Sequence, residues 1–393
     1  MKILMLCDFY DKKLEFQENI LTKYYTKFNH EVTVITSTFD DVFDYYAGNH
    51  DNNLPKKVYY DHEVKIIKLP YKFNILNKLR VYVNIQEILD DEKPDLIYVH
   101  DIMLNILECV KYIKKNPKTK MIMDYHADYS NSGKNWLSLN ILHGVIRKWY
   151  LDKSMQYISK IFPVVPAGEI FLNEIYNVPY SKMEVLPLGA DVDLCNEIQN
   201  DKKLLISLKN KYNILGDSKV IVTGGKLTPR KKVELLIEAF RTINNNKYHL
   251  IIIGGSSDVD DIYIKMLKDL SKDNSNIHFT GWLNTREIYA HFHISTLAVF
   301  PASQSILWQQ SIAAGLPLIV GNTGGQSIKY LNKYNNIIIL QKDNINVAKL
   351  IYSIELVFED EYKYNTMKVG SQKITKEKLD WNSLIKKTTN IGK

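Results

Sequence analysis

A glycine-rich, basic segment in the second half of the chain has the composition of an anion-binding loop. Residues 224–232 read GGKLTPRKK, follow an apolar run typical of a strand, and precede a helical pattern that begins near Val233. Glycine allows a ligand to come close to the backbone, and a helix N-terminus with nearby cations attracts anions. A diphosphate would fit here without a metal; a solvated basic turn is the alternative. The candidate binding residues are Gly225, Lys226, Arg230 and Lys231.

The segment at 301–317, which reads PASQSILWQQSIAAGLP, has residue types that could bind a sugar. Ser305 is a favourable N-cap for a helix that begins at Ile306, and Gly315 followed by Pro317 is a typical helix end. Side-chain amides can both donate to and accept from sugar hydroxyls. A surface helix with two polar glutamines is the alternative. This segment adds Gln304, Ser305 and Gln310 to the candidates.

A third segment, GNTGGQS at 321–327, follows the next predicted strand. Its paired glycines before a helix would let backbone N–H groups face a phosphate or a sugar. A Gly-Gly pair is also common in tight turns, so its position directly after the second segment is what makes it informative. The candidates here are Gly324, Gly325 and Gln326.

In the first half of the chain, polar residues follow several predicted strands. His126 comes after one of them, and Asp124, Asp128 and Tyr129 lie close to it in sequence. A histidine tuned by a carboxylate can bind developing negative charge or relay a proton, whereas a lone histidine is more often structural. We therefore take His126 as a candidate catalytic residue. The candidates for a second ligand on this half are Asp8, Tyr10, Gln17, His100 and Asp101.

Short apolar runs alternate with longer amphipathic segments along the whole chain. In the first half the predicted strands are Lys2–Cys7, Glu31–Ile35, Val64–Leu69, Leu96–Val99, Met121–Asp124, Ile161–Val165 and Glu184–Leu186, and the predicted helices include Gln17–Phe28, Asn77–Asp90 and Met103–Lys114. After a polar stretch near Asp191–Lys219 the predicted strands are Val220–Thr223, His249–Ile253, Ile277–Phe279, Thr296–Phe300, Pro317–Val320 and Asn336–Leu340, and the helices include Val233–Ile243, Ile262–Leu270 and Ile306–Ala314.

This alternation predicts an α/β fold with two Rossmann-like, doubly wound domains. In such sheets ligands bind beyond the carboxyl ends of the strands, so we expect the two domains to face a central cleft. The predicted boundaries are residues 1–190 for the first domain and 191–375 for the second. Residues 376–393 are expected to form a C-terminal helix that returns to the first domain.

Composition narrows the class of protein. The chain has 393 residues, a net charge of +7 and 45% hydrophobic residues, which is enough for two globular cores. Its three cysteines, Cys7, Cys109 and Cys195, have no pairing or metal-ligand spacing, which is typical of a reducing cytoplasm. We expect no signal peptide, no membrane span and no bound metal. The basic balance alone does not predict nucleic-acid binding, because no recognition motif accompanies it.

These segments resemble family 4 of the retaining glycosyltransferases, which have the GT-B fold. Residues 185–193, VLPLGADVD, are similar to the interdomain signature of the family, and 225–231 resembles its Gly-Arg…Lys loop with Lys226 in place of the arginine. Residues 30–34 and 94–100 resemble two strands of the family's acceptor domain. His126 matches its cleft histidine.

One feature departs from the family pattern. The family carries two glutamates seven residues apart; Gln310 stands in place of the second, and the first has no counterpart. Gln304 is the nearest polar substitute. The segment Ser305–Gln310 instead resembles a branch with a Ser-x-Leu-Trp-x-Gln helix. This departure leaves the identity of the donor open.

The resemblance implies an enzyme that transfers a sugar from a nucleotide-diphosphate sugar. The donor would lie on the second domain, with Lys226 and Lys231 on its diphosphate and His126 near the reacting sugar. Configuration would be retained, with no cofactor and no metal. The implied acceptor is a glycan or lipid-linked molecule of bacterial cell-envelope polysaccharide synthesis. We expect a cytoplasmic protein that could contact the inner face of the membrane through the basic stretches Lys65–Arg80 and Lys111–Lys120.

Two alternatives remain open at the level of sequence. A sugar-nucleotide epimerase can share this architecture and would act on the nucleotide sugar alone. A non-catalytic subunit that binds a nucleotide sugar is the other, because the usual glutamates are missing.

Overall fold

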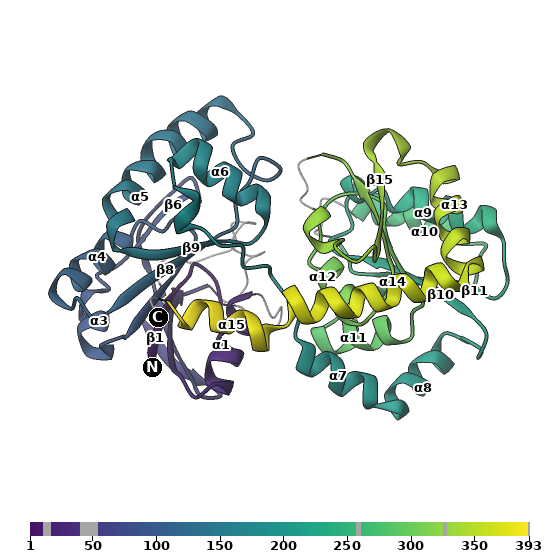
Figure 1. The fold of residues 1–393 in the computed structure, drawn as a ribbon, viewed down its shortest axis with the longest axis horizontal. Helices are drawn as coiled ribbons and strands as arrows, with labels where there is room; N and C mark the ends of the chain where they lie inside the picture. The colour runs from purple at the N-terminus through teal and green to yellow at the C-terminus, as the bar shows by residue number, and fades with distance from the viewer. Residues whose placement is uncertain (11–16, 40–53, 257–260, 325–327, 392–393) are drawn as a thin grey trace. The chain divides into compact units, whose positions relative to one another are not determined.

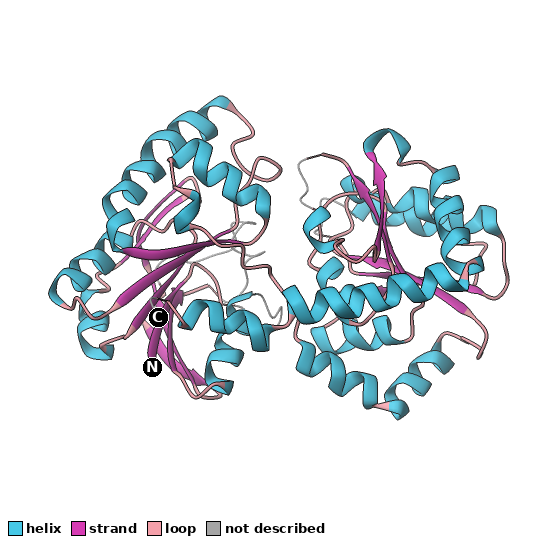
Figure 2. Cartoon of the chain, viewed as in Figure 1, coloured by secondary structure: helices cyan, strands magenta, loops and turns pink. Residues whose placement is uncertain are grey.

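The chain forms two compact units. The computed structural model describes residues 1–10, 17–39, 54–256, 261–324 and 328–391. Unit 1 comprises Met1–Pro187 and Asn382–Lys393, and unit 2 comprises Leu188–Trp381. Both units are layered α/β structures in which helices cover the faces of a central sheet (Figure 1, Figure 2). The chain leaves unit 1 near residue 187, a few residues before the predicted boundary, and returns to it near residue 382.

Unit 1 is built on a seven-stranded sheet with the order β3-β4-β2-β1-β7-β8-β9. Neighbouring strands are parallel, except for the antiparallel edge pair β3–β4. The strands are β1 Lys2–Leu6, β2 Glu31–Ser37, β3 Lys57–Asp61, β4 Val64–Leu69, β7 Leu96–His100, β8 Lys120–Tyr125 and β9 Ile158–Pro163. The α-helices are α1 Gln17–Lys27, α3 Gln86–Glu92, α4 Ile106–Lys115, α5 Lys148–Ser154, α6 Pro166–Tyr176 and the C-terminal α15 Trp381–Thr389, and α5 continues a π-helix, η1 Leu137–Arg147.

Unit 2 contains a six-stranded, all-parallel sheet with the order β12-β11-β10-β13-β14-β15. Its strands are β10 Lys219–Gly224, β11 Tyr248–Ile253, β12 Ile277–Gly281, β13 Leu297–Phe300, β14 Leu318–Asn322 and β15 Ile337–Gln341. Its helices are α7 Val192–Asn200, α8 Lys202–Lys211, α9 Val233–Ile243, α10 Asp261–Ser271, α11 Thr285–His293, α12 Leu307–Ala313, α13 Val347–Glu359 and α14 Glu361–Ile374.

The central strands are apolar on both faces because helices cover both sides of each sheet. In β1, residues Ile3 to Leu6 are at most 1% exposed, and in β10 residues Val220–Val222 are equally buried. In unit 2 separate clusters of buried side chains lie against the two faces, one around Trp308 and the other around Phe240. These continuous apolar runs are the sequence pattern that predicts the strands.

Each sheet has a point where the strand order reverses. In unit 1 the chain builds from β1 toward β3 and then crosses to β7 on the other side of β1. In unit 2 it builds from β10 toward β12 and then crosses to β13 on the other side of β10. The loops that follow such a pair of strands diverge and leave a crevice where ligands bind in open α/β sheets. The candidates at 7–10, 100–101, 224–232 and 301–306 follow these strand pairs.

Two sequence predictions in unit 1 are wrong. The helix expected at Asn77–Asp90 is instead a hairpin, β5 Tyr71–Ile75 and β6 Leu79–Tyr82, followed by the short α3. Leu76 and Asn77, at its tip, both have positive φ angles, of 53° and 54°, the conformation of tight hairpin turns. A run as short as β6 does not distinguish the alternation of a strand from the period of a helix.

The strand expected at Glu184–Leu186 does not form. Glu184 and Leu186 each donate a backbone hydrogen bond to β9, at 3.1 Å to Ile161 O and 3.0 Å to Pro163 O. Only Met183 forms a β-bridge, to Ile161. The segment runs beside the sheet edge, and its continuation leads out of unit 1.

The C-terminal helix α15 packs on unit 1 beside α1 (Figure 1). Tyr25 Oη, buried in α1, donates a 2.7 Å hydrogen bond to Thr388 Oγ1. Lys27 Nζ donates to Asn382 Oδ1 at 2.6 Å, and Lys387 pairs with Glu184 at 2.8 Å. These contacts fix the last helix to the first unit of the chain.

Candidate functional site

The candidates of unit 2 meet beside the carboxyl end of β10. Gly225 has a φ of +115°, and a Cβ placed on it would lie 3.3 Å from Ser305 Oγ and 3.6 Å from Lys231 Nζ. Lys231 Nζ donates a 2.9 Å hydrogen bond to Gln304 O. The loop after β10 and the loop after β13 therefore hold one ammonium group against a side-chain-free stretch of backbone. We call Gly225, Lys231, Gln304 and Ser305 the cradle.

Lys231 is electrostatically unusual. Burial, together with the neighbouring charge of Arg230, lowers the pKa of its ammonium group to about 8. Gln304 O is a neutral partner, so the charge of Lys231 is not neutralised by it. An anion that entered the cradle would gain a charge-assisted hydrogen bond in a place that water reaches poorly. Lys226 and Arg230, on the same loop, are exposed and add positive charge nearby.

A second glycine pair supports the cradle, and the sequence analysis missed it. Gly225 N donates to Ile253 O at 3.0 Å, and Leu227 N donates to Gly255 O at 2.7 Å. A Cβ on Gly254, whose φ is +112°, would lie 2.0 Å from Gly225 O. The signal was a Gly-Gly pair directly after β11, where Gly254 follows β11 as Gly225 follows β10.

Gly254→Ala is expected to disturb the cradle. The new methyl group would overlap Gly225 O in a backbone region that alanine adopts poorly, so the β10 loop must move. We expect the affinity for inorganic pyrophosphate, measured by calorimetry, to fall at least tenfold (~1.4 kcal/mol). Gly315→Ala is the matched control, because Gly315, at the end of α12, also has a positive φ, +80°, but a Cβ placed on it would come no closer than 3.9 Å to a described atom, on the side chain of Gln372. Equal losses in both variants would mean that general backbone strain, and not this contact, is responsible.

The helix after β13 begins one residue later than predicted. Helix α12 starts at Leu307, and the cap position is Ile306, which has no side-chain cap. Ser305 is therefore not the N-cap; its Oγ accepts a 3.4 Å hydrogen bond from Leu307 N and otherwise lies toward Gly225. The hydroxyl group of Ser305 therefore lies in the cradle and does not cap the helix.

The two glutamines of α12 differ in their partners. Gln309 Oε1 accepts a 2.7 Å hydrogen bond from Gly189 N, which fixes the start of unit 2 on α12. Gln310 is 8% exposed, and its Oε1 has no hydrogen-bond partner among the described residues. A buried carbonyl without a donor is costly, so Gln310 is the better candidate for a ligand hydroxyl. The sequence did not single out Gln309, because sequence alone does not distinguish a glutamine that holds the fold from one that binds a ligand.

The loop after β14 is described only in part. Gly324 has a φ of +99°, and its N–H donates to Asn322 Oδ1 at 3.1 Å. The neighbouring loop is close, since a Cβ on Gly321 would collide with Pro301 O. Gly325 and Gln326 lie outside the described residues.

In unit 1 a buried carboxylate organises two of the candidates. Asp124, at the end of β8, is fully buried. Its Oδ2 lies 3.0 Å from His100 Nδ1 and 3.3 Å from His126 Nε2, and it accepts a 2.9 Å hydrogen bond from Tyr98 Oη. Its Oδ1 accepts from Asp101 N at 3.0 Å. The rings of His100 and His126 lie 4.5 Å apart.

Negative and positive side chains alternate in this group. We call Glu18, Tyr98, His100, Asp124 and His126 the His100 cluster. His100 Nε2 lies 3.1 Å from Glu18 Oε1. Burial alone would lower the pKa of His100, but Asp124 and Glu18 raise it to about 10. Burial would raise the pKa of Asp124, but His100 and His126 hold it well below its usual range. His100 is therefore a cation between two anions at neutral pH.

The same side chains have the geometry of a metal-ligand set. One ligand atom each from His100, Asp124 and His126 lies within 4.8 Å of the others. Spacing along the chain does not reveal this set, because the residues come from two strands. His100 already uses both ring nitrogens, Nδ1 toward Asp124 and Nε2 toward Glu18, so these side chains have partners without a metal ion.

Other candidates of unit 1 have internal partners. Asp8 pairs with Arg80 at 2.5 Å and accepts from Tyr71 Oη at 3.0 Å, so it fixes the β5–β6 hairpin. Tyr10 is 5% exposed, and its hydroxyl lies 3.1 Å from Thr22 Oγ1, which leaves it little freedom to bind a ligand.

Gln17, the first residue of α1, is buried, and neither polar atom of its side chain has a partner among the described residues. Of the three residues expected around His126, only Asp124 contacts the ring. Asp128 accepts from Ser130 N at 2.7 Å, and Tyr129 Oη donates to Glu174 at 2.6 Å.

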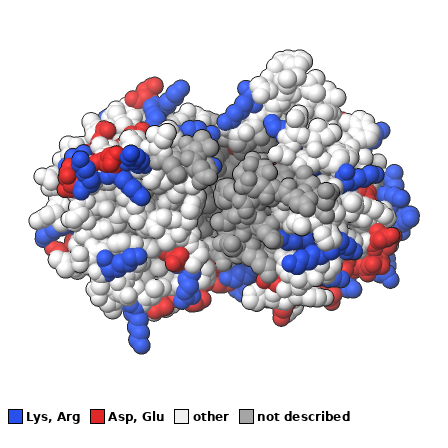
Figure 3. Space-filling view, turned by 180° about the vertical axis from the view of Figure 1, so that it is seen from behind, with Lys and Arg blue, Asp and Glu red and all other residues white. Residues whose placement is uncertain are grey.

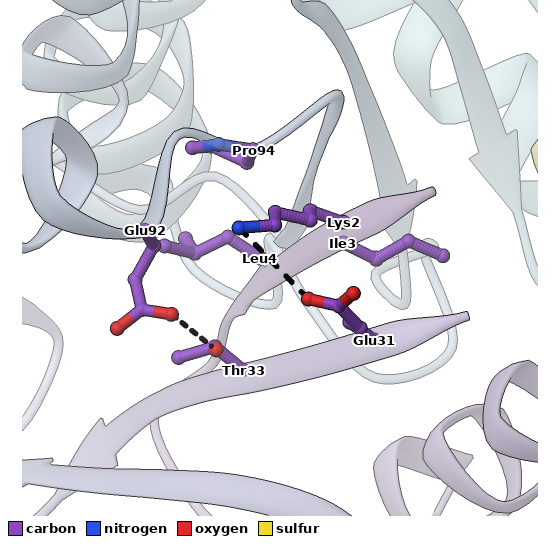
Figure 4. Close-up of a pocket in the computed structure, with 7 residues that line it drawn as sticks. All are labelled: Lys2, Ile3, Leu4, Glu31, Thr33, Glu92 and Pro94. Atoms are coloured by element: carbon purple, nitrogen blue, oxygen red, sulfur yellow. Dashed lines mark hydrogen bonds and ion pairs between the residues drawn. The ribbon is translucent and has the colours of Figure 1, made fainter.

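A small pocket at the opposite edge of the first sheet is a poor candidate. It lies at the amino ends of β1 and β2, between Lys2, Thr33 and Glu92 (Figure 4). Thr33 Oγ1 donates to Glu92 at 2.9 Å. Its polar groups are paired, and it lies away from the edge where ligands bind in such sheets.

Comparison with known proteins identifies the class of enzyme. A family model described as Glycosyltransferase Family 4 matches residues 20–194, and one described as Glycosyl transferases group 1 matches residues 206–373. Together they cover most of the chain, one on each half. The chain is a group 1 glycosyltransferase. Its fold is GT-B, with two Rossmann-like domains.

Relatives of this glycosyltransferase are distant. It is 24% identical over 329 residues to an uncharacterized glycosyltransferase of Methanocaldococcus jannaschii, covering 78% of this chain and 77% of that protein. It is 28% identical over 162 residues to a GDP-mannose-dependent phosphatidylinositol monomannoside mannosyltransferase of Mycobacterium tuberculosis. This match covers 37% of this chain and 40% of that protein. The structure of Anabaena HepE in complex with UDP superposes with a TM-score of 0.71 at 15% identity over 99% of both chains.

In the part of the glycosyltransferase that the structure describes, no helix is both long and apolar enough to cross a bilayer.

Proposed function

We propose that this glycosyltransferase takes its sugar from a nucleotide-diphosphate sugar bound at the cradle of unit 2. The observation that carries the proposal is the half-buried ammonium group of Lys231, which is bonded to the neutral Gln304 O beside the side-chain-free backbone of Gly225. A diphosphate supplies the anion that this geometry suits. The structures of Anabaena HepE in complex with UDP and with UDP-glucose support this class of donor.

The cradle would act on the leaving group. During transfer, the bond from the anomeric carbon to the phosphate oxygen breaks, and negative charge builds on the diphosphate. Lys231, Lys226 and nearby N–H groups would stabilise that charge, an effect worth several kcal/mol for a well-placed donor (roughly 3–4 kcal/mol). The acceptor oxygen bonds to the anomeric carbon, and the leaving phosphate takes the acceptor proton, with retention of configuration. Neither a metal nor a cofactor takes part in this scheme.

We assign the acceptor to unit 1. Gln17, whose buried polar atoms have no partner among the described residues, begins the helix that follows β1. The His100 cluster gathers at the carboxyl ends of β7 and β8, on the other side of the switch point. His126, by its resemblance to the family histidine, would bond the reacting sugar. Several relatives are named as enzymes of lipid or lipopolysaccharide glycosylation, including a lipopolysaccharide N-acetylglucosaminetransferase of Salmonella typhimurium. A glycan or lipid-linked acceptor of the cell envelope, used on the cytoplasmic side of the membrane, fits them.

A thermal-shift screen of nucleotide sugars tests the donor assignment. A bound donor raises the melting temperature by mass action, about 2.7 kcal/mol of stabilisation at one hundred times Kd. We expect one donor to stabilise the wild type and not the Lys226→Ala/Lys231→Ala double variant. NMR of that donor alone and with cell-envelope extract then separates transfer from epimerisation. Absence of a shift with every nucleotide sugar would overturn the proposal.

Donor binding is expected to weaken at alkaline pH. The pKa of Lys231 in the free enzyme is about 8, and only its protonated form pairs with a diphosphate. Affinity should be constant below about pH 7 and fall toward tenfold per pH unit above about pH 8. Calorimetry from pH 6 to 10 measures this. Lys231→Arg, which stays charged, should flatten the curve; a wild-type affinity that is constant to pH 10 would contradict the prediction.

A further inference from the structure

A stripe of apolar side chains lies exposed on the helix formed by η1 and α5. Along this continuous helix, from Leu137 to Ser154, large apolar residues recur every four positions. Residues four apart lie on one side of a helix, so they form one surface. The exposed fractions are 68% for Trp136, 67% for Leu137, 40% for Ile141, 58% for Val145 and 51% for Trp149. We call these five residues the apolar stripe.

The stripe is not the face that holds the helix on unit 1. Leu151 and His143, from another side of the helix, are buried. Leu151 belongs to the core of unit 1, and His143 Nδ1 lies 2.6 Å from the buried Tyr176 Oη. The helix therefore has its own packing face, and the stripe is additional apolar surface. Five large side chains gathered in this way differ from the isolated exposed residues of an ordinary surface.

The tip of the β5–β6 hairpin carries further exposed apolar side chains. Phe73, Ile75 and Leu76 are exposed there, Leu76 by 86%. The positive charge of Lys78, in the same tip, contributes to lowering the pKa of His143, after burial and Arg147. The tip therefore lies near η1, although His143 belongs to the packing face of that helix and not to the stripe.

Basic residues accompany the apolar ones. Residues 134–153 contain four lysines or arginines and a single acid, Asp152. The hairpin at 71–82 contains three basic residues and no acid, and one of the three, Arg80, is paired with Asp8. Lys72, Lys78, Lys134 and Lys153 are exposed. Seen from behind in Figure 3, the upper end of unit 1, on the right, is mostly white with blue side chains beside it.

This combination identifies one kind of partner. A helix that lies in a membrane interface has Trp and aliphatic residues on one face and Lys or Arg beside them. Anionic lipids attract each basic residue near the surface by about 1 kcal/mol. An acidic protein surface would satisfy the lysines but would not need two exposed tryptophans. The charge and the aromatic content together favour lipid headgroups.

We propose that the apolar stripe and the β5–β6 tip form a docking surface for an anionic lipid bilayer. The proposal deepens the proposed function, because a membrane-bound enzyme would meet a lipid-linked acceptor there, but docking itself needs no donor. Of the two basic stretches expected to contact a membrane, Lys65–Arg80 contains the hairpin tip. In the stretch Lys111–Lys120 the apolar Tyr112 and Ile113 are buried in the core of unit 1, so this stretch offers lysines but no exposed apolar face of its own.

Vesicle co-sedimentation of the full chain tests the surface. The wild type is expected to bind vesicles of phosphatidylcholine with about 30% phosphatidylglycerol, to bind pure phosphatidylcholine at least tenfold more weakly, and to lose binding as salt rises. The variant Leu137→Ser/Ile141→Ser/Val145→Ser should bind at least tenfold more weakly. Leu215→Ser/Ile262→Ser/Tyr362→Ser, on exposed apolar residues of unit 2, is the matched control and should bind like the wild type.

Three results would overturn the docking proposal: no binding of the wild type, equal binding of the stripe variant, or a dimer of the wild type that the stripe variant abolishes. Circular dichroism and the melting temperature show that the variants are folded. Donor binding, measured without vesicles, separates the two proposals. The stripe variant should keep it; a wild type that binds vesicles but no nucleotide sugar would refute the proposed function and leave docking intact.

Discussion

Replacing Lys231 with alanine is expected to lower kcat/KM for the donor by about 10²–10³-fold, the usual cost of removing one donor to a developing oxyanion. Lys231 Nζ is held 2.9 Å from Gln304 O and opposite Gly225. Its place is therefore fixed before the donor binds, so little reorganisation is needed when charge develops. Steady-state kinetics with the donor found in the thermal-shift screen measure the effect.

Two further variants make this result specific. Lys247→Ala removes the same charge from unit 2, but Lys247 is exposed, pairs with Asp217 and precedes β11, at the opposite edge of the sheet. It should change kcat/KM by less than about twofold. Adding Lys226→Ala to Lys231→Ala should deepen the loss. Equal activity of Lys231→Ala and Lys247→Ala would show that the cradle takes no part in catalysis.

The sheet of unit 2 was largely predictable because its strands are continuous apolar runs, several of which are followed by glycine or proline. The predicted helix Val233–Ile243 matches α9, and the strand at 249–253 differs from β11 by one residue. What could not be predicted is which loops touch. Gly254 supports Gly225 because β11 lies next to β10 in the sheet. The pattern of residues along the chain does not give the order of the strands.

The His100 cluster shows the same limit. The sequence placed polar residues at the ends of β7 and β8, and His100 and Asp124 prove to be register partners on these neighbouring strands. Glu18 reaches them from α1. The expected environment of His126 rested on sequence neighbours, and two of those three turn elsewhere. The sequence therefore predicted that these residues lie at the carboxyl ends of the strands. It did not predict which residues of other strands and helices they contact.

Asp124→Ala is expected to destabilise unit 1 by about 3–5 kcal/mol, the cost of breaking a buried ion pair by removing one partner. The substitution would leave Tyr98 Oη, Asp101 N and the ring of His100 without their common acceptor. Urea unfolding, followed by a probe in unit 1, measures the change. Asp124→Asn should cost less, since an amide oxygen can still accept from Tyr98 or Asp101. Asp152→Ala, on an exposed acid of α5, should leave stability nearly unchanged.

The dependence of this loss on pH separates an electrostatic role of Asp124 from a packing role. His100 has a pKa of about 10 in the folded protein against 6.5 ordinarily, so its contribution is complete below about pH 6.5 and is lost as pH rises toward 10. The depressed pKa of Asp124 acts in the opposite sense, and its contribution is lost as pH falls below about 4. The stability difference between wild type and Asp124→Asn should therefore be largest between about pH 4 and 6.5 and shrink toward pH 10. A difference that is constant from about pH 5 to 10 would mean that Asp124 serves packing alone. In that case the charge of His100 would not depend on Asp124.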